Sequence, residues 1–450
     1  MSEALFGTDG IRGVALQPPL DAATLGRLGL ALAGELAAAG QPLRILLAGD
    51  TRASTEVLAS WVGGGFRAAG GELQWAGVLP TPAISHLLRE DGGYGAGVIV
   101  SASHNPAADN GIKLVTGSGA KWPVAQERAL ERRLRGLAGE PTGDGLPAVD
   151  RSLGERYLDL LGRTLPPQPL AGMRLVADAA NGAASPLAER FFAGLGADVV
   201  VISASPTGAN INAGCGALYP QHLAREVVAR GAEAGVAFDG DADRAILVTG
   251  TGRILDGDDV LYLWALALAE AGTLAGSTVV ATVMSNLGLE LALGAQGIRV
   301  VRCPVGDREV WEAMTREGAV LGGEQSGHVI CAHHAVTGDG LLTAAHILAI
   351  ARRRGSPLES LARLQRLPQV LRNVRVARRR RLEEVPALAA EIAAVRERFG
   401  EQGRVLVRYS GTEPLLRIMV EADTAEGALA AADDLVAAAR KHLGSSEPGR

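Results

Sequence analysis

The sequence predicts three similar α/β domains followed by a smaller α+β domain. A chain of 450 residues is too long for one hydrophobic core, so several domains are expected. Up to about Pro368, one order of elements recurs three times: strand, turn, helix, strand, and then a glycine-led apolar strand that ends in a polar loop. Beyond Pro368 this order stops. The predicted domains are residues 1–154, 155–255, 256–368 and 369–450.

The first domain begins with a helix that Asp21 can cap and that Gly40 ends. Its further elements are a strand at 43–48 that runs into the turn GDTR, a helix at 55–69, a strand at 73–78 and an apolar strand at 97–100. Gly63, Gly65 and Ala68 mimic a dinucleotide-binding fingerprint, but they lie in the middle of the predicted helix. We reject the fingerprint because it must follow a strand and open a helix.

The other domains are predicted from the same kinds of pattern. The second has strands at 173–178 and 198–202 and a helix at 186–195; the third has a helix at 258–271 and strands at 278–283 and 299–303; the fourth has strands at 370–376, 405–408 and 417–421 and helices at 382–399 and 425–443. The three apolar strands that end in polar loops begin at Gly97, Gly235 and Gly318. The three units share little sequence identity, so the repeat rests on the order of elements alone.

The composition argues against several classes of protein. A net charge of −5 and a pI of about 6.0 are not those of a general nucleic-acid binder, which needs a basic surface. The longest apolar run, at 260–269, is too short to span a membrane, and the polar N-terminus lacks a signal-peptide core. The three cysteines, at 215, 303 and 331, show no metal-binding spacing and indicate a reduced, cytoplasmic location.

The loop after the first glycine-led strand carries reactive side chains. Ser103 is a potential nucleophile, His104 can move protons, and Lys113 is a cation. Only three of the 44 basic residues are lysines, so a lysine here stands out in a chain that otherwise uses arginine. Lysine can release its proton when it is buried and arginine in practice cannot, which favours proton transfer at this loop. An ordinary polar connection between a strand and a helix is the alternative.

The loop after the second glycine-led strand reads DGDADR and holds three alternate aspartates, Asp239, Asp241 and Asp243. Alternate side chains of an extended segment face the same way, and three gathered carboxylates repel one another unless a hard cation lies among them. Ligands that are all oxygen suit Mg²⁺ or Ca²⁺. An acidic surface turn is the alternative.

Two further loops fit a phosphorylated sugar. GGEQSGH, after the third glycine-led strand, offers Glu324, Ser326 and His328 to sugar hydroxyls, although a plain turn explains it equally well. RYSGTEPLLR in the fourth domain combines hydroxyls, backbone N–H groups and two arginines, which together suit a phosphate cradle. An ordinary β-turn is the alternative for this second loop.

Taken together, these loops show that the sequence resembles the α-D-phosphohexomutase superfamily. The resemblance spans nearly the whole chain and rests on five motifs in the superfamily's order: FGTDGIRG at 6–13, SASHNP at 101–106, DGDADR at 239–244, GEQSGH at 323–328 and SGTEP at 410–414. Ala242 stands where the superfamily often has glycine, and Tyr409 stands where it often has proline. Neither position supplies a ligand in the superfamily's pattern, so the departures affect only local loop shape.

The resemblance implies four domains around a central cleft and a phosphoserine at Ser103. It also implies one Mg²⁺ ion, held by a phosphoserine oxygen and by Asp239, Asp241 and Asp243. The groups expected around the reacting phosphate are Arg12, His104, Lys113 and Arg244, of which His104 and Lys113 are the candidates for proton transfer. The groups expected to hold the sugar are Glu324, Ser326 and His328, and those expected to clamp the non-reacting phosphate are Arg408, Ser410, Gly411, Thr412 and Arg417.

The reaction implied by the resemblance interconverts glucosamine 6-phosphate and glucosamine 1-phosphate and feeds UDP-N-acetylglucosamine synthesis. Glucosamine or glucose 1,6-bisphosphate is the expected activator, a small phosphosugar is the expected partner, and the protein is expected to be a monomer or a homodimer. A mutase for mannose or glucose phosphates, a Mg²⁺-dependent sugar phosphatase and a non-catalytic phosphosugar-binding protein are the alternatives.

Overall fold

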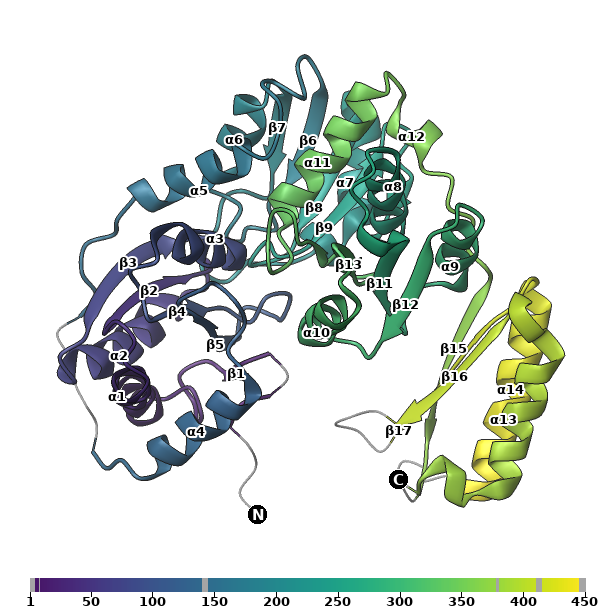
Figure 1. Ribbon diagram of the computed structural model, residues 1–450, viewed down its shortest axis with the longest axis horizontal. Coiled ribbons are helices and arrows are strands. Elements are labelled where there is room, and N and C mark those ends of the chain that lie inside the picture. Colours follow the sequence, from purple (N-terminus) through teal and green to yellow (C-terminus); the bar gives the residue numbers. More distant parts are fainter. Residues whose placement is uncertain (1–4, 8, 140–144, 378–379, 410–414, 445–450) are drawn as a thin grey trace. The chain divides into compact units, whose positions relative to one another are not determined.

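The computed structural model describes residues 5–7, 9–139, 145–377, 380–409 and 415–444. The chain forms two compact units, labelled by element in Figure 1. The first unit consists of Met1–Thr282 and Cys303–Arg363, and the second consists of Val283–Arg302 and Leu364–Arg450.

The first sheet of the first unit has the strand order β1-β5-β4-β2-β3. Its strands are β1 (Ile11–Val14), β2 (Arg44–Gly49), β3 (Glu72–Val78), β4 (Ala96–Val100) and β5 (Asp109–Thr116). The helices that follow the chain through this region are α1 (Ala22–Ala38), α2 (Thr55–Ala68), α3 (Thr81–Asp91), α4 (Val124–Arg135) and α5 (Ser152–Gly162). β2 is parallel to β3 and β4, whereas β5 is antiparallel to β4 and β1.

Side chains alternate between the two faces of β4, as expected for a strand buried on both sides. Val98 and Val100 belong to a core with Leu28 of α1 and Phe66 of α2. Gly97 faces α3 on the opposite side of the sheet. The predicted cap of α1 is confirmed, because the Asp21 side chain accepts a hydrogen bond from the Thr24 amide at 2.9 Å.

The second sheet has the order β10-β9-β8-β6-β7. Its elements are β6 (Arg174–Asp178), α6 (Ala188–Gly194), β7 (Asp198–Ile202), α7 (Pro220–Arg230), β8 (Ala234–Phe238), β9 (Ala245–Thr249) and β10 (Ile254–Leu255). The later elements of the first unit are α8 (Gly257–Glu270), β11 (Thr278–Thr282), α10 (Asp307–Glu317), β13 (Leu321–Gly323), β14 (Val329–Cys331), α11 (Gly340–Arg353) and α12 (Leu358–Leu361). The predicted repeat is visible in the strand orders β5-β4-β2, β9-β8-β6 and β14-β13-β11.

The register of the repeat differs from the prediction in the third copy. Gly97 lies opposite the third residue of β2, and Gly235 lies opposite the third residue of β6. The equivalent glycine opposite the third residue of β11 is Gly322. Gly318, which we took for the first residue of the strand, instead ends α10 with a left-handed φ of 65°. Two glycines so close together cannot be told apart by pattern.

The three equivalent glycines share a packing role. A Cβ atom on Gly97 would lie 2.5 Å from Ile84 of α3, and one on Gly235 would lie 2.5 Å from Val227 of α7. A Cβ atom on Gly322 would lie 2.7 Å from the sulfur of Met314 in α10. In each copy, therefore, glycine lets the preceding helix lie close against the strand that leads into the functional loop.

We expect Gly97→Ala to destabilise the protein by about 1–3 kcal/mol, because the new methyl group overpacks the contact with α3. Urea denaturation should show a lower midpoint for this variant. The matched control is Gly194→Ala at the end of α6, where a Cβ atom meets nothing within 4 Å. Equal midpoints for the two variants would contradict the packing role.

One predicted loop is partly a strand. We placed residues 101–113 in a single loop, but β5 begins at Asp109 and contains Lys113. Its sequence, DNGIKLVT, is polar at the start and contains glycine, which is typical of a turn. Pairing with β4 on one side and β1 on the other overrides that local preference. Lys113 is therefore fixed by a sheet rather than by a loop.

The second unit contains a separate three-stranded sheet of order β15-β17-β16. The elements of the second unit are α9 (Leu287–Gly294), β12 (Arg299–Cys303, of which the last residue belongs to the first unit), β15 (Gln369–Arg375), α13 (Pro386–Phe399), β16 (Arg404–Tyr409), β17 (Leu415–Glu421) and α14 (Ala425–Leu443). Helices α13 and α14 and the sheet enclose a core that includes Ile392, Ile418 and Leu435. Among the described residues, no helix combines the length and the apolar composition needed to cross a bilayer.

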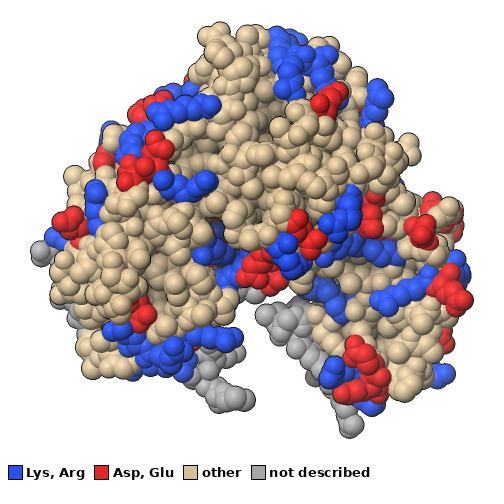
Figure 2. Space-filling view, in the orientation of Figure 1, with Lys and Arg blue, Asp and Glu red and all other residues tan. Residues whose placement is uncertain are grey.

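The charged residues on the face shown in Figure 2 are of both signs, and one group of basic side chains lies over α4. The last turn of α4 contains Arg132, Arg133 and Arg135. Two of them have acidic partners, since Arg133 pairs with Glu35 and Arg135 with Glu131. These partners partly neutralise the basic group.

Candidate active site

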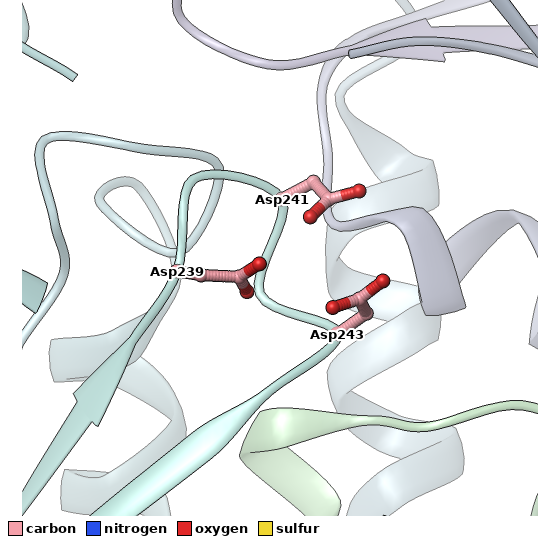
Figure 3. A group of neighbouring side chains, drawn as sticks. All are labelled: Asp239, Asp241 and Asp243. Carbon is pink, nitrogen blue, oxygen red and sulfur yellow. The ribbon is translucent and has the colours of Figure 1, made fainter. Parts of the chain in front are cut away.

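Three buried aspartates lie on the loop between β8 and β9, with their carboxylates gathered on one side of it (Figure 3). Atoms of Asp239, Asp241 and Asp243 that could bind a metal all lie within 4.8 Å of one another. The apolar strands β8 and β9 are buried along their length and turn sharply here. Ala242 makes that turn with a left-handed φ of 55°, which explains why glycine suits this position.

The three carboxylates have different electrostatic environments. Burial and the neighbouring Asp243 and Asp241 raise the pKa of Asp239 well above its usual range. Burial and Asp241 likewise raise the pKa of Asp243. Burial also acts to raise the pKa of Asp241, but Lys113 and hydrogen bonds from Thr81 and Lys113 lower it below the usual value. The Lys113 ammonium therefore stabilises one of the three negative charges and leaves the other two poorly compensated.

This group has the properties of a cation site. Its donors are carboxylate oxygens, which hard divalent ions prefer. Within the part of the chain that the structure describes, the buried Oδ1 atoms of Asp241 and Asp243 have no hydrogen-bond partner. Buried carboxylate oxygens are costly unless they bind something, so a metal ion fits this position.

Ser103 lies against the acidic group. Its Oγ donates a hydrogen bond to Oδ2 of Asp239 at 2.6 Å and lies 3.2 Å from Nδ1 of His104. Ser103 follows the carboxyl end of β4, and Asp239 follows the carboxyl end of β8 in the next sheet. The serine has a left-handed φ of 51°, a strained conformation for a residue with a side chain.

Lys113 reaches the acidic group from β5. Its Nζ donates to Oδ2 of Asp241 at 2.9 Å and lies 3.7 Å from Oδ2 of Asp243. Burial acts to lower the pKa of Lys113, but Asp241, Asp9 and Asp243 raise it well above its usual value. In this arrangement Lys113 is a fixed positive charge that holds its proton tightly, because the acidic neighbours outweigh the effect of burial.

The network continues to a second lysine that the motifs did not reveal. Lys113 pairs with Asp9 at 3.1 Å, Asp9 pairs with Lys121 at 2.9 Å, and Lys121 pairs with Asp307 at 2.5 Å. Asp307 is the first residue of α10, so the network joins the two lysines of the first sheet region to the third copy of the repeat. The rarity of lysine in this chain was a usable signal for Lys121 as well as for Lys113.

The other charged candidates surround Ser103. The Arg12 guanidinium donates to the Ala102 carbonyl at 3.4 Å and pairs with Asp9 at 2.5 Å. Arg244 Nε lies 3.9 Å from Asp239 and 3.7 Å from Asp243. Burial, followed by the charges of Arg244 and Arg12, lowers the pKa of His104 to about 4. His104 is therefore a neutral imidazole at pH 7.

The third loop is held close to this group, but its three candidates differ in position. The Glu324 carboxylate accepts a hydrogen bond from the Gly306 amide at 3.0 Å and lies near enough to Arg244 to contribute to the raised pKa of that arginine. Ser326 is exposed. His328 is buried, and its Nε2 accepts from the Gly338 amide at 3.2 Å. Ser326 is thus open to solvent, whereas His328 lines a cavity together with Lys113 and Asp243.

The fourth loop belongs to the second unit. Ser410, Gly411 and Thr412 lie outside the described residues. Arg408 and Arg417 lie directly opposite each other on β16 and β17, and burial together with Arg417 lowers the pKa of Arg408. Like charges in opposite positions of a sheet are unfavourable, and an anion bound between them would relieve the repulsion.

Sequence reasoning missed the residues beneath Ser103. Asp50 and Arg52 form a buried ion pair in the GDTR turn, and Asn212 approaches the same place from the loop after β7. The signal for the first two was their position after β2, whose carboxyl end shares a sheet edge with β4. Asn212 gave no such signal, because its loop follows a different sheet.

Four successive parts of the chain each match the model of a known domain. Residues 3–138, 155–252, 256–367 and 371–438 match the models of α/β/α domains I, II and III and of the C-terminal domain of phosphoglucomutase/phosphomannomutase. These matches agree with the predicted fold of three α/β domains followed by a smaller domain.

Similar proteins match over nearly the full length. A phosphoglucosamine mutase of Solibacter usitatus is 48% identical over 99% of this chain and 100% of its own, and one of Moorella thermoacetica is 48% identical over 93% of this chain and 95% of its own. The crystal structure of a phosphoglucomutase/phosphomannomutase family protein from Burkholderia thailandensis covers all of both chains, with a TM-score of 0.83 and 26% identity.

Proposed function

The chain belongs to the phosphoglucomutase/phosphomannomutase family, and from this premise we propose that it is a phosphoglucosamine mutase, an isomerase that interconverts glucosamine 6-phosphate and glucosamine 1-phosphate. The observation that carries the proposal is the 2.6 Å contact between Ser103 Oγ and Asp239, which places a hydroxyl beside three metal-binding carboxylates. The names of the two bacterial relatives support the amino sugar over glucose or mannose.

The reaction proceeds through phosphorylated Ser103. The free 1-hydroxyl of glucosamine 6-phosphate attacks the phosphorus, the bond from phosphorus to Ser103 Oγ breaks, and a 1,6-bisphosphate forms. The attacking hydroxyl passes its proton to His104, and the serine oxygen takes a proton from Lys113. After the bisphosphate turns around, Ser103 takes the 6-phosphoryl group back and glucosamine 1-phosphate leaves. The same bisphosphate, or glucose 1,6-bisphosphate, phosphorylates enzyme that has lost its phosphoryl group.

The residues for Mg²⁺ are Asp239, Asp241 and Asp243 with an oxygen of the phosphoserine. Bound there, the ion supplies positive charge against the oxygens of the transferring group. Arg244 and Arg12 add cationic hydrogen-bond donors on the same side as Ser103. Their fixed positions matter because phosphoryl transfer depends mostly on positioning and electrostatics.

The proton-transfer groups are Lys113 and His104. Lys113 is the candidate proton donor because it is protonated, and its three acidic neighbours raise its pKa, so that it releases the proton only as their charge is compensated. His104 is the better acceptor, because it is neutral and its Nδ1 lies 3.2 Å from Ser103 Oγ. The pair can return to its starting state in each cycle, since the second phosphoryl transfer reverses the proton movements of the first.

The substrate is held at both ends. We assign Glu324, Ser326 and His328 to the sugar hydroxyls and the loop between β16 and β17 to the non-reacting phosphate. Arg408 and Arg417 would supply positive charge there, and Ser410, Gly411 and Thr412 would supply hydroxyl and backbone N–H donors. The cytoplasmic location, the choice between monomer and homodimer, and the domain boundaries stay predictions.

We expect the purified protein to isomerise glucosamine 1-phosphate with a kcat/KM at least about tenfold above that for glucose 1-phosphate or mannose 1-phosphate. Each sugar phosphate should be assayed with Mg²⁺ and a catalytic amount of glucose 1,6-bisphosphate. Faster turnover of mannose or glucose phosphate would assign the enzyme to a hexose instead. Release of inorganic phosphate without isomer would identify a phosphatase.

A further inference from the structure

The turn that carries Ser103 is held in place by hydrogen bonds to its main-chain carbonyls. The carbonyls of Ser103 and Asn105 each accept hydrogen bonds from the same two side chains, Arg52 and Asn212. Arg52 Nη2 donates to the Ser103 oxygen at 3.2 Å and to the Asn105 oxygen at 2.6 Å. Asn212 Nδ2 donates to the same two oxygens at 2.9 and 3.4 Å. We call the side chains of Arg52 and Asn212 together the clamp.

The arginine of this clamp is itself fixed. Arg52 and Asp50 form an ion pair whose side chains are both fully buried, and the Arg52 amide also donates to Asp50 Oδ1 at 3.0 Å. Asp50 Oδ2 accepts from the Ser101 hydroxyl at 2.6 Å, and that hydroxyl accepts from the Ser103 amide at 2.9 Å. Asp50 thus holds the amide side of Ser103 while Arg52 holds the carbonyl side.

The asparagine of the clamp comes from the second sheet region. Asn212 has a left-handed φ of 59°, and its amide donates to the Ala180 carbonyl at 2.8 Å. The GDTR turn contacts this region as well, through a 3.0 Å bond from the Ala53 amide to the Gly208 carbonyl. Asn212 therefore ties the serine turn to the part of the chain that carries the aspartates.

The loop that carries the three aspartates (239–243), which we call the metal loop, packs against the Ser103 carbonyl and the Asn212 side chain. A Cβ atom on Gly240, between Asp239 and Asp241, would lie 2.5 Å from the Ser103 oxygen and 2.9 Å from Asn212 Nδ2. Glycine is required here because the two loops and Asn212 pack together without room for a side chain. The separation of Ser103 Oγ from Asp239 is thus set by one compact arrangement of three segments.

We propose that Arg52 and Asn212 are positioning residues for phosphoryl transfer, which hold the strained Ser103 turn in register with the metal loop. The proposal rests on the proposed function, since it concerns the phosphoserine of that reaction. Both side chains reach Ser103 through its main-chain oxygen rather than through Oγ: Asn212 donates to the Ser103 and Asn105 carbonyls, and Arg52 donates to these carbonyls and to Asp50. A displacement of about 1 Å at a reacting group can cost a factor of about 100 in rate, so loss of the clamp acts on catalysis more than on binding.

The experiment compares Asn212→Ala with Asn210→Ala. Asn210 shapes the same loop, because its side chain bonds to Ser205 and Thr207, but within the described residues it forms no hydrogen bond with the serine turn. For each variant we would measure kcat and KM for glucosamine 1-phosphate, and the rate at which the phosphorylated enzyme releases inorganic phosphate in the absence of sugar. In that side reaction a water oxygen bonds to phosphorus, the bond to Ser103 Oγ breaks, and the water proton passes to the serine oxygen.

We expect Asn212→Ala to lower kcat by about 10–100-fold with KM changed by less than about threefold. The ratio of phosphate released to isomer formed should rise by at least about tenfold, because misplacing the phosphoryl group slows its transfer to the sugar more than its transfer to water. Asn210→Ala should leave both kcat and this ratio near the wild-type values. A merely structural role would lower the folded fraction without moving the ratio.

Asn212→Asp provides a second variant if the alanine variant does not fold, because aspartate has the same size, adopts the left-handed φ and lacks the donor, and Arg52→Lys keeps the charge of Arg52 while losing its forked donor. A wild-type ratio and kcat in a folded Asn212 variant would overturn the proposal. The wild-type protein serves as the test of the premise in the same assay. If it does not isomerise glucosamine 1-phosphate, the proposed function fails; if it does and the variants match it, only the positioning role fails.

Discussion

Replacing Ser103 with alanine is expected to abolish mutase turnover, even when glucose 1,6-bisphosphate is supplied. The substitution removes the oxygen that gives the phosphoryl group to the sugar in the first half-reaction and takes one back in the second. The expected loss is at least about a thousandfold in kcat/KM, or about 4 kcal/mol of transition-state stabilisation. Turnover of glucosamine 1-phosphate, followed as formation of the 6-phosphate, measures the effect.

Intact-mass measurement separates loss of the nucleophile from loss of structure. The wild-type protein, after incubation with the bisphosphate, should gain one phosphoryl group that the Ser103→Ala variant lacks. The control is Ser60→Ala on α2, whose hydroxyl donates to the Val57 carbonyl of its own helix. Wild-type turnover in the Ser103 variant, or the same added mass in both proteins, would assign the phosphoryl group to another residue.

The sequence predicted the parts of this site that are continuous in the chain. SASHNP and DGDADR each follow a short apolar strand, so both the loop and its sheet edge could be read from local pattern. The convergence of the two loops could not be read, because it depends on how the first and second sheets pack. The 2.6 Å contact from Ser103 to Asp239 spans 136 residues of sequence.

Asn212 and Lys121 were missed for the same reason, because each acts through a contact that is distant in the chain. Asn212 bonds to a turn 109 residues earlier, and Lys121 reaches an aspartate 186 residues later. Both are ordinary polar residues in their own surroundings. Lys113 was recognised as important but placed in a loop, because the strand β5 is specified by its neighbours β4 and β1 rather than by its own composition. Local pattern thus found the chemistry, and tertiary contact decided its geometry.

Removing the charge of either Asp241 or Asp243 should weaken Mg²⁺ binding. We expect Asp241→Asn and Asp243→Asn each to raise the Mg²⁺ concentration for half-maximal turnover by at least about 10–100-fold, the loss seen when only a supporting contact of a metal ligand is removed. Titration of turnover with Mg²⁺ and calorimetric binding of Mg²⁺ measure this effect. Asp198→Asn, at an exposed position in the same sheet, is the control.

The two substitutions should have opposite effects on the protein without metal. Asp243 has a raised pKa, so its charged form is disfavoured by the fold, and a neutral asparagine should raise the thermal midpoint. Asp241 has a lowered pKa and accepts from Lys113 at 2.9 Å and from Thr81 at 2.6 Å. Its loss leaves a buried ammonium with a weaker set of partners, which should cost about 1–3 kcal/mol.

Adding Mg²⁺ should then raise the thermal midpoint of the wild-type protein much more than that of either variant, because a ligand stabilises only the form that binds it. The thermal midpoints of the two variants and of the wild type, each measured with and without Mg²⁺, distinguish a metal site from an acidic structural turn. In a structural turn the two asparagine variants would still differ in stability, since their ion pairs differ, but Mg²⁺ would stabilise neither them nor the wild type. In a metal site the repulsion between Asp239 and Asp243 is the cost of holding their charges ready for the ion, and Lys113 limits that cost by stabilising Asp241 in its absence.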